Sequence, residues 1–121
     1  MDERVRATIA FMITNLHRKI TPLELARSVR LSPAHLRELF KDETGTSITR
    51  YRNQLRLARA KHLLETTFLS IKEVAASVGI GEISHFVRDF KKAYGMTPSE
   101  YRNAIAAAAK HDHYRRNPQT G

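Results

Sequence analysis

The sequence contains two related stretches on either side of a continuous helical segment. Residues 25–52 match residues 74–102, first at a spacing of 49 residues and then, after one inserted residue, at a spacing of 50. The matched pairs are Ala26–Ala75, Ser28–Ser77, Val29–Val78 and Leu31–Ile80 before the insertion, and Leu36–Phe86, Phe40–Phe90, Lys41–Lys91, Gly45–Gly95, Tyr51–Tyr101 and Arg52–Arg102 after it. An internal repeat of this kind predicts two copies of one helical unit.

The segment between the copies, residues 47–66, predicts one long helix. It contains no Pro or Gly and is rich in residues that favour helices. Its apolar residues form two stripes, Ile48, Tyr51, Leu55 and Ala58 on one side and Leu57, Ala60 and Leu64 on the other. A surface helix normally has a single apolar stripe. We therefore expect a semi-rigid linker of roughly 28 Å that packs against one unit on each side.

Each copy predicts two short helices joined by a tight turn, which is the helix-turn-helix pattern. Capping-box sequences start helices at residues 21–24, 70–73 and 97–100, and Gly45 and Gly79 are suited to helix ends. The expected helices cover residues 2–18, 22–29, 33–44, 47–66, 71–78 and 82–93, with a last one from 98 through 105. The first has the apolar stripe Val5, Ile9, Met12, Ile13 and Leu16.

These elements predict an all-α fold of seven helices, with two helix-turn-helix units joined by the linker helix. We expect a first subdomain at residues 1–46, the linker helix at 47–66 and a second subdomain at 67–109. Residues 110–121 hold Pro, His and Arg without an apolar stripe, and we interpret them as a flexible basic tail.

The charge balance indicates the kind of partner. The chain has 21 Lys and Arg against 12 Asp and Glu, a net charge of +9. This favours a polyanion, most often nucleic acid, although charge alone fits a soluble basic protein equally well. The absence of Cys excludes disulfides, thiolate catalysis and Cys-based zinc sites. No apolar run approaches about 18 residues and no signal-peptide core is present, so no membrane interaction is expected.

The outer face of the second helix in each unit is the candidate for reading DNA. Leu36, Leu39 and Phe40 mark the core side of the first such helix, and Phe86 and Phe90 mark it in the second. The outward or flanking residues, which we predict to read bases, are Ala34, His35, Arg37, Glu38 and Lys41, and Ser84, His85, Arg88 and Lys91. A solvated helix face gives the same pattern, but the repeat and the charge together favour major-groove reading.

Side-chain chemistry suggests roles for these residues. Arg37 or Arg88 is suited to guanine O6 and N7, and Glu38 to a cytosine amino group. The predicted phosphate contacts are Thr21 and Ser70, at the amide ends of two helices, together with Arg52, Arg56 and Lys92.

The linker length fits the geometry of DNA. Adjacent major-groove segments on one face of the duplex lie about 34 Å apart, so one monomer is expected to place a helix in each. Because the two candidate helices differ in sequence, the expected site is asymmetric and not palindromic.

At these residues the chain resembles the AraC/XylS family of bacterial transcription regulators over about residues 5–106. The residues that carry the resemblance are Ala75, Gly79, His85, Phe86, Phe90, Lys91, Lys92, Gly95, Thr97, Pro98, Tyr101 and Arg102, with Ala26, Leu36, Phe40, Gly45, Arg56 and Ala60 in the first half. Ile80, Gly81 and Ile83 depart from the family's usual residues.

The resemblance implies homeodomain-like halves, sequence-specific promoter binding in the cytoplasm, at the nucleoid, and contact with RNA polymerase. Activation and repression stay open alternatives, of which we expect activation. Many family members carry an effector-binding or dimerising domain before this one, so we expect a fragment of a longer regulator over a stand-alone protein. No cofactor is implied.

Three other classes of protein are alternatives. A nonspecific nucleoid-type DNA binder and a helical protein-interaction module share the helical pattern. An enzyme is disfavoured because no nucleophile motif or phosphate loop occurs. His111 and His113 lack further ligands nearby in sequence, so no metal site is predicted.

Overall fold

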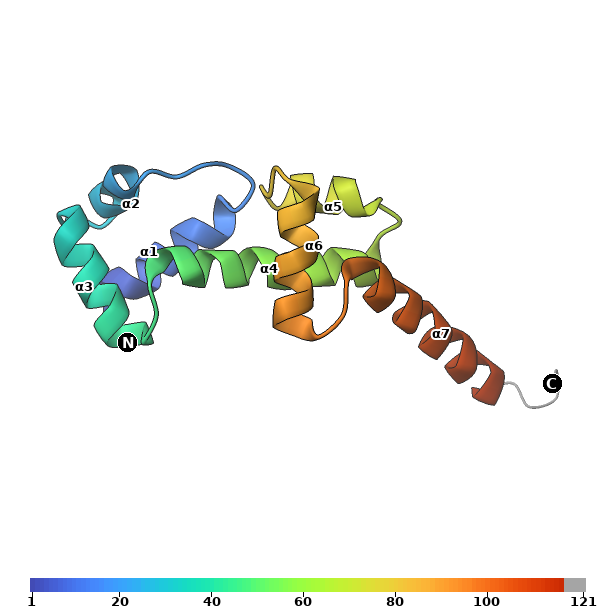
Figure 1. The fold of residues 1–121 in the computed structure, drawn as a ribbon. Helices are drawn as coiled ribbons and strands as arrows, with labels where there is room; N and C mark the ends of the chain where they lie inside the picture. The colour runs from blue at the N-terminus through green and yellow to red at the C-terminus, as the bar shows by residue number, and fades with distance from the viewer. Residues whose placement is uncertain (117–121) are drawn as a thin grey trace.

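The computed structural model describes the backbone of residues 1–116 and the side chains of residues 1–110. Over this range the chain forms seven α-helices and no strand (Figure 1). They are α1 (Glu3–Thr14), α2 (Pro22–Ser28), α3 (Pro33–Thr44), α4 (Ile48–Thr66), α5 (Ile71–Ser77), α6 (Ile83–Tyr94) and α7 (Pro98–Arg116). The predicted all-α fold of seven helices is confirmed.

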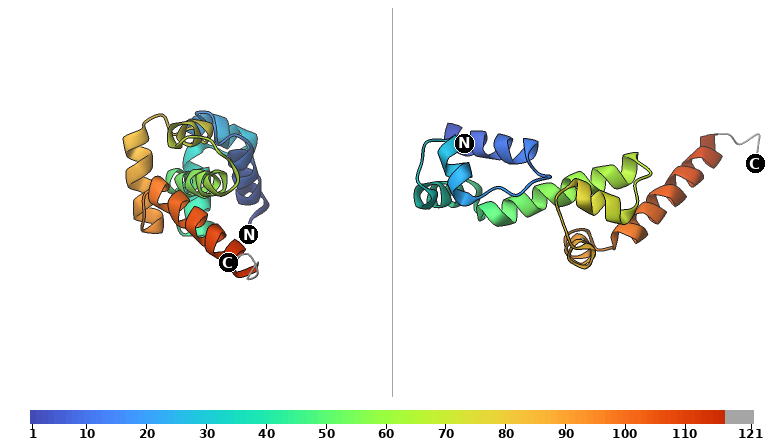
Figure 2. Two further views of the ribbon diagram at one scale, coloured as in Figure 1. Left: turned by 90° about the vertical axis from the view of Figure 1, so that its right-hand side faces the viewer. Right: turned by 90° about the horizontal axis from the view of Figure 1, so that it is seen from above.

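The long helix α4 is the shared element of the molecule. Helices α1–α3 gather at its N-terminal end and α5–α7 at its C-terminal end, which gives an elongated shape (Figures 1 and 2). Each group has its own hydrophobic core. The first core contains Val5, Met12, Leu25, Ala26, Leu36 and Phe40, and the second contains Leu57, Ala60, Leu64, Val74, Ala75, Val78, Phe86 and Phe90.

The two apolar stripes of α4 pack as the sequence predicts, with one exception. Leu57, Ala60 and Leu64 belong to the second core, and Ile48, Tyr51 and Leu55 pack against the first. Ala58, expected in the first stripe, is exposed. Helix α4 therefore links the two units by contributing to both cores.

Helix α1 ends earlier than expected. The prediction extended it to Arg18, but Asn15 caps it, because its backbone N–H donates to Met12 O and its amide donates to Phe11 O. Ile13, expected in the apolar stripe, is 53% exposed. The following residues instead form a turn that leads along α4 towards α2.

One of the three predicted capping boxes is incomplete. Thr21 Oγ1 accepts from the backbone N–H of Glu24, but the Glu24 carboxylate turns to Arg18, 2.6 Å away. The boxes at Ser70–Glu73 and Thr97–Glu100 have both hydrogen bonds. The local sequence did not reveal Arg18 as a competitor for the first carboxylate.

Helix α7 is longer than predicted and continues to Arg116. Residues 110–116, assigned to a flexible tail, are therefore helical. A run of alanines at 106–109 favours helix, and no Pro occurs between Pro98 and Pro118. Residues 117–121 lie outside the described part of the chain, and so do the side chains of His111 and His113.

Candidate nucleic-acid interface

Helix α3 lies beyond the N-terminal end of α4, and α6 crosses α4 near its middle; both run at a steep angle to the axis of α4 (Figure 1). Leu36 and Phe40 of α3 and Phe86 and Phe90 of α6 are buried, so the core-facing sides of both helices are as predicted. The predicted base-reading residues Ala34, His35, Arg37, Glu38, Lys41, Ser84, His85, Arg88 and Lys91 are all exposed. Their contact with DNA stays a prediction.

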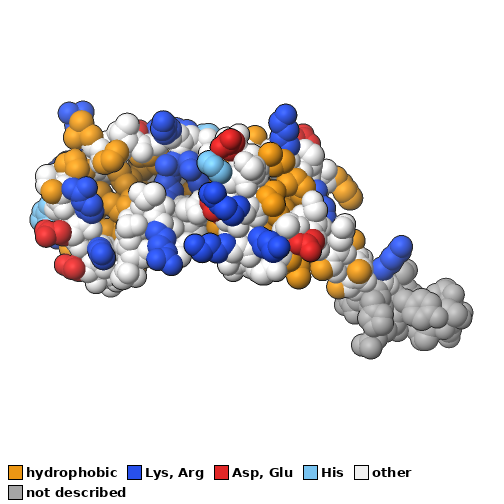
Figure 3. All heavy atoms as spheres, in the orientation of Figure 1, with side chains coloured by type: hydrophobic (Ala, Val, Ile, Leu, Met, Phe, Trp, Pro, Cys, Tyr) orange, Lys and Arg blue, Asp and Glu red, His pale blue; other side chains and the backbone are white. Residues whose placement is uncertain are grey.

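Lys and Arg side chains gather in a band across the face of the molecule that carries α6 (Figure 3). Acidic side chains are fewer on this face and lie mostly beside α3 and α6. Such a band is the electrostatic footprint expected of a surface that follows a phosphate backbone.

The two helices begin differently. Ser32 caps α3, because its Oγ accepts from the backbone N–H of His35 at 3.2 Å. Glu82 stands before α6 without a side-chain capping bond, and its carboxylate lies 3.2 Å from His85 Nε2. Arg88 Nε lies 3.4 Å from Asp89 Oδ1. Exposed pairs of this kind contribute little free energy. His85 and Arg88 can therefore break these pairs to contact DNA at a small cost in free energy.

Arg52 and Arg56 have contacts within the fold that the sequence did not predict. Nη2 of Arg52 donates a hydrogen bond to the carbonyl oxygen of Arg18 and lies 3.4 Å from the carbonyl oxygen of Asn15. Arg56 Nε donates to Leu16 O at 3.0 Å. Burial lowers the pKa of both guanidinium groups, and for Arg52 the charges of Arg56 and Arg18 add to this. Both side chains stay charged at neutral pH.

These arginines tie the turn after α1 to the middle of α4. The same arrangement recurs in the second unit, where Arg102 of α7 donates to the carbonyls of Leu64, Thr67 and Leu69 at the end of α4. The match between Arg52 and Arg102 in the repeat was the signal for this structural role. The phosphate contacts of Arg52 and Arg56 stay a prediction beside it.

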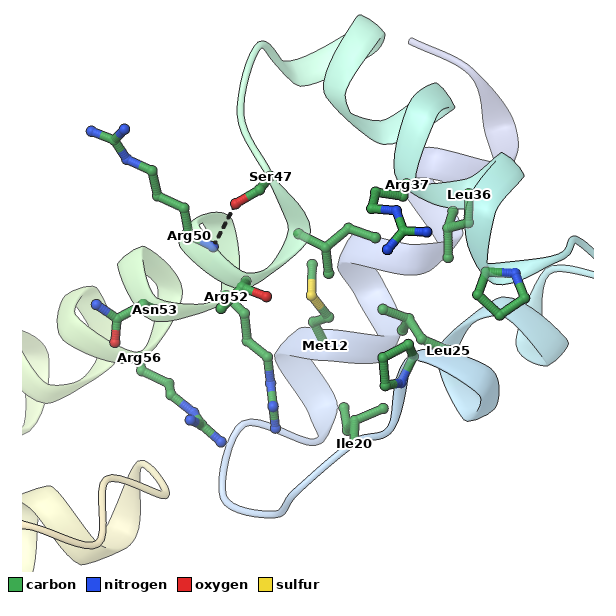
Figure 4. Close-up of a pocket in the computed structure, with 14 residues that line it drawn as sticks. Met12, Ile20, Leu25, Leu36, Arg37, Ser47, Arg50, Arg52, Asn53 and Arg56 are labelled. Atoms are coloured by element: carbon green, nitrogen blue, oxygen red, sulfur yellow. Dashed lines mark hydrogen bonds between the residues drawn. The ribbon is translucent and has the colours of Figure 1, made fainter.

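A hollow of about 550 Å³ lies between the start of α4 and the helices α1–α3 (Figure 4). Met12, Leu25 and Leu36 form part of its apolar floor. Arg37 reaches over it from α3, and Arg50 extends outward from the start of α4 (Figure 4). Arg50 is exposed and is not among the residues predicted to contact DNA.

The remaining predicted phosphate contacts lie at the surface. Thr21 and Ser70 are exposed, but each hydroxyl already accepts the N–H of the glutamate three residues on. Those glutamates reduce the attraction of the two helix ends for an anion. Lys92 is exposed near the end of α6. The phosphate contacts of all three residues stay a prediction.

Comparisons with known proteins agree with this geometry. A family model described as a helix-turn-helix domain matches residues 25–104. The arabinose operon regulatory protein of Escherichia coli (strain K12) is 37% identical over 103 residues, which cover 84% of this chain and 35% of that protein. The chain spans about a third of the length of the curated relatives it matches.

Solved structures of the same kind superpose on most of the chain. An AraC-type transcriptional regulator from Chromobacterium violaceum has a TM-score of 0.81 at 29% identity, with 85% of this chain and 92% of that chain covered. The DNA-binding domain of AdpA, a global transcriptional factor solved with a target DNA, has a TM-score of 0.82 at 25% identity, with 88% and 96% covered.

The fold and the exposed faces of α3 and α6 define a double helix-turn-helix DNA-binding module. The chain belongs to the AraC/XylS family of transcriptional regulators. It is an AraC-type DNA-binding domain. The relatives are regulators of transcription, which agrees with the prediction of a regulator and not an enzyme. Within residues 1–116, no helix is long and apolar enough to cross a membrane.

Proposed function

We propose that the domain binds a promoter by placing α3 and α6 in successive major grooves on one face of the DNA. The observation that carries this proposal is that one continuous helix, α4, contributes to the cores behind both α3 and α6. Each of these helices turns polar side chains to solvent on the side away from its core. Two readers on one chain thus need no second subunit to span a helical turn.

The site bound in this way is asymmetric. Arg37 and Glu38 of α3 stand where α6 has Val87 and Arg88, one repeat later. Arg88 and Arg37 are assigned to guanines and Glu38 to a cytosine amino group, because these are the base edges that match their donors and acceptors. Lys92 and Arg50 add positive charge for the flanking phosphates.

We further propose that the domain acts at nucleoid DNA in the cytoplasm, as part of a longer regulator that carries an effector or dimerisation domain. Activation then requires contact with RNA polymerase near the bound site. The length of the curated relatives supports this view, since the chain covers about a third of each.

In vitro selection of bound DNA, followed by hydroxyl-radical footprinting, tests the proposal. We expect one enriched, non-palindromic sequence with two protected patches on one face, about one helical turn apart. Protection of a single turn contradicts the two-groove arrangement. Equal binding to all DNA favours a nonspecific nucleoid-type protein, and no binding at low salt favours a helical protein-interaction module.

A further inference from the structure

Beyond their common helix, the two units touch where the turn after α1 meets the end of α5. Gly79 follows α5, and a Cβ built there would lie 2.5 Å from the backbone oxygen of Leu16 and 3.1 Å from the carbonyl carbon of His17. It would also lie 3.0 Å from an Nη2 of Arg56. Leu16 O in turn accepts the hydrogen bond from Arg56 Nε. We call the contact of Leu16, Arg56 and Gly79 the inter-unit contact.

The backbone conformation does not by itself require glycine at position 79. In the first unit the equivalent residue is Arg30, which has a φ of 58°, while Gly79 has a φ of 81°. The hydrogen bonds that close the two turns also match, since Leu31 N–H donates to Ala26 O and Ile80 N–H donates to Ala75 O. An arginine is accepted in the first turn, so the close approach of Leu16 is what singles out Gly79.

Arg56 also has no counterpart in the second copy of the repeat. Arg52 has its counterpart in Arg102, and both tie a turn to the next long helix. The position one repeat after Arg56 is Ala106, which is exposed. A single unit therefore does not need the Arg56 bond, whereas Arg56 is in direct reach of both Leu16 in the first unit and Gly79 in the second.

We propose that the inter-unit contact fixes the angle between the two units and thereby sets the spacing of half-sites that the domain accepts. The inference rests on the proposed two-groove binding. The two cores share no residue, so apart from α4 the units meet where the turn after α1 approaches the end of α5. With a lever of half the length of α4, roughly 14 Å, a rotation of about 14° moves a reader by about 3.4 Å, one base-pair step.

The first test measures the free protein. The chain has no Cys, so Asp42→Cys and Ala93→Cys, at exposed positions of α3 and α6, accept spin labels for a distance measurement between the units. Gly79→Ala should broaden or shift the distance distribution. Gly95→Ala is the matched control, because Gly95 also has a φ of 81° but has nothing within 4 Å of the added Cβ.

Arg56→Gln provides a second variant that removes the bond to Leu16 without adding a Cβ at position 79. It decides the question if Gly79→Ala fails to fold. We expect Arg56→Gln to broaden the distance distribution while Gly95→Ala leaves it as narrow as in the parent. An unchanged distribution in Arg56→Gln, and in Gly79→Ala if that variant folds, overturns the proposal.

The second test uses the selected DNA site with one base pair inserted or removed between its halves. The parent and Gly95→Ala should lose about tenfold or more in affinity, whereas Arg56→Gln should lose only about threefold or less. Equal losses in all variants contradict a role in half-site spacing. If the distance distribution broadens but even the parent prefers no sequence, the proposed function fails and the role in holding the angle stands.

Discussion

The two helix-turn-helix units share a scaffold but differ in how each is stabilised. In the first core Phe40 meets Tyr51 edge to face at a centroid distance of 5.3 Å. In the second core the ring centroid of Phe90 lies within 5.8 Å of the ring centroids of Phe86, Tyr94 and Tyr101, so four aromatic rings form one cluster. Burial and the hydrogen bond to Glu65 raise the pKa of Tyr101 to about 12, so its hydroxyl stays protonated.

The positions that repeat between the two units stabilise the fold, whereas the positions that differ lie at the surfaces proposed to act in DNA binding. Repeated residues such as Gly45 and Gly95 end α3 and α6, and Arg52 and Arg102 hold the adjoining turns. The positions that differ are the outward faces of α3 and α6 and the inter-unit contact. A duplicated scaffold can therefore present two different outward faces without a change of fold.

The largest expected effect sharpens the contrast between the two cores. Phe90→Ala should cost about 3–5 kcal/mol of unfolding free energy, because the ring is fully buried among three others. Phe40→Ala should lie at the lower end of the same range, about 3 kcal/mol. Urea unfolding followed by circular dichroism measures both. Hydrogen exchange should place the loss from Phe90→Ala in α5–α7, and an unchanged melting temperature would refute its packing role.

The next prediction concerns the readers. Arg88→Ala should lose about 1–3 kcal/mol of binding free energy and relax the preference at one base pair, because the proposed bidentate contact to guanine is lost. Fluorescence anisotropy with the selected site and its single-base variants measures this. Arg6→Ala is the control, since Arg6 is exposed on α1, which lies on the side of α4 away from α6 (Figure 2). Uniform weakening on all sequences would make Arg88 a phosphate contact.

Local signals in the sequence were sufficient for most of the fold. Capping residues and glycines lie next to the helix ends they define, so the starts of α2–α5 and α7 and the ends of α3 and α6 were predictable. The 3.6-residue period showed which sides of α3 and α6 face a core, and hence which polar residues are exposed. The repeat then indicated two units on one linker.

Contacts between distant residues were beyond reach of the same signals. The carbonyls that receive Arg52 and Arg56 lie more than 30 positions away, and Arg18 takes the Glu24 carboxylate from the expected capping box. The approach of Leu16 to Gly79 joins two units whose relative placement no local pattern specifies. Nor did the tail composition show that α7 continues to Arg116.

A smaller effect tests the difference between the two turns. Arg30→Gly should stabilise the protein by about 1 kcal/mol, because relief of left-handed strain exceeds the added freedom of the unfolded chain. Arg30→Ala is the control, since it removes the long side chain but keeps a Cβ. Thermal unfolding of the two variants side by side measures the gain. An equal gain in both would attribute it to the side chain and not to the backbone.

The smallest effect compares Glu73, in the complete capping box, with Glu24, which pairs with Arg18 instead. The hydrogen bond from the Ser70 backbone lowers the pKa of Glu73, and the hydrogen bond from Arg18 lowers the pKa of Glu24. Each carboxylate therefore stabilises the fold above its unfolded pKa, and this is lost as pH falls through the folded pKa. Glu73→Gln and Glu24→Gln should both lower the melting temperature slightly at neutral pH. In both variants the melting temperature should also decrease less as the pH falls into the acid range.

Salt separates the two glutamates. The partner of Glu24 is a charged guanidinium at the surface, so about 1 M salt should screen most of the effect of Glu24→Gln. The partner of Glu73 is an uncharged backbone N–H, 2.9 Å from Oε1, and the side-chain oxygen of Gln can accept the same bond, so the effect of Glu73→Gln should be small and change little with salt. Melting curves at low and high salt distinguish these outcomes. An equal response of the two variants would mean that the first turns of α2 and α5 are stabilised in the same way.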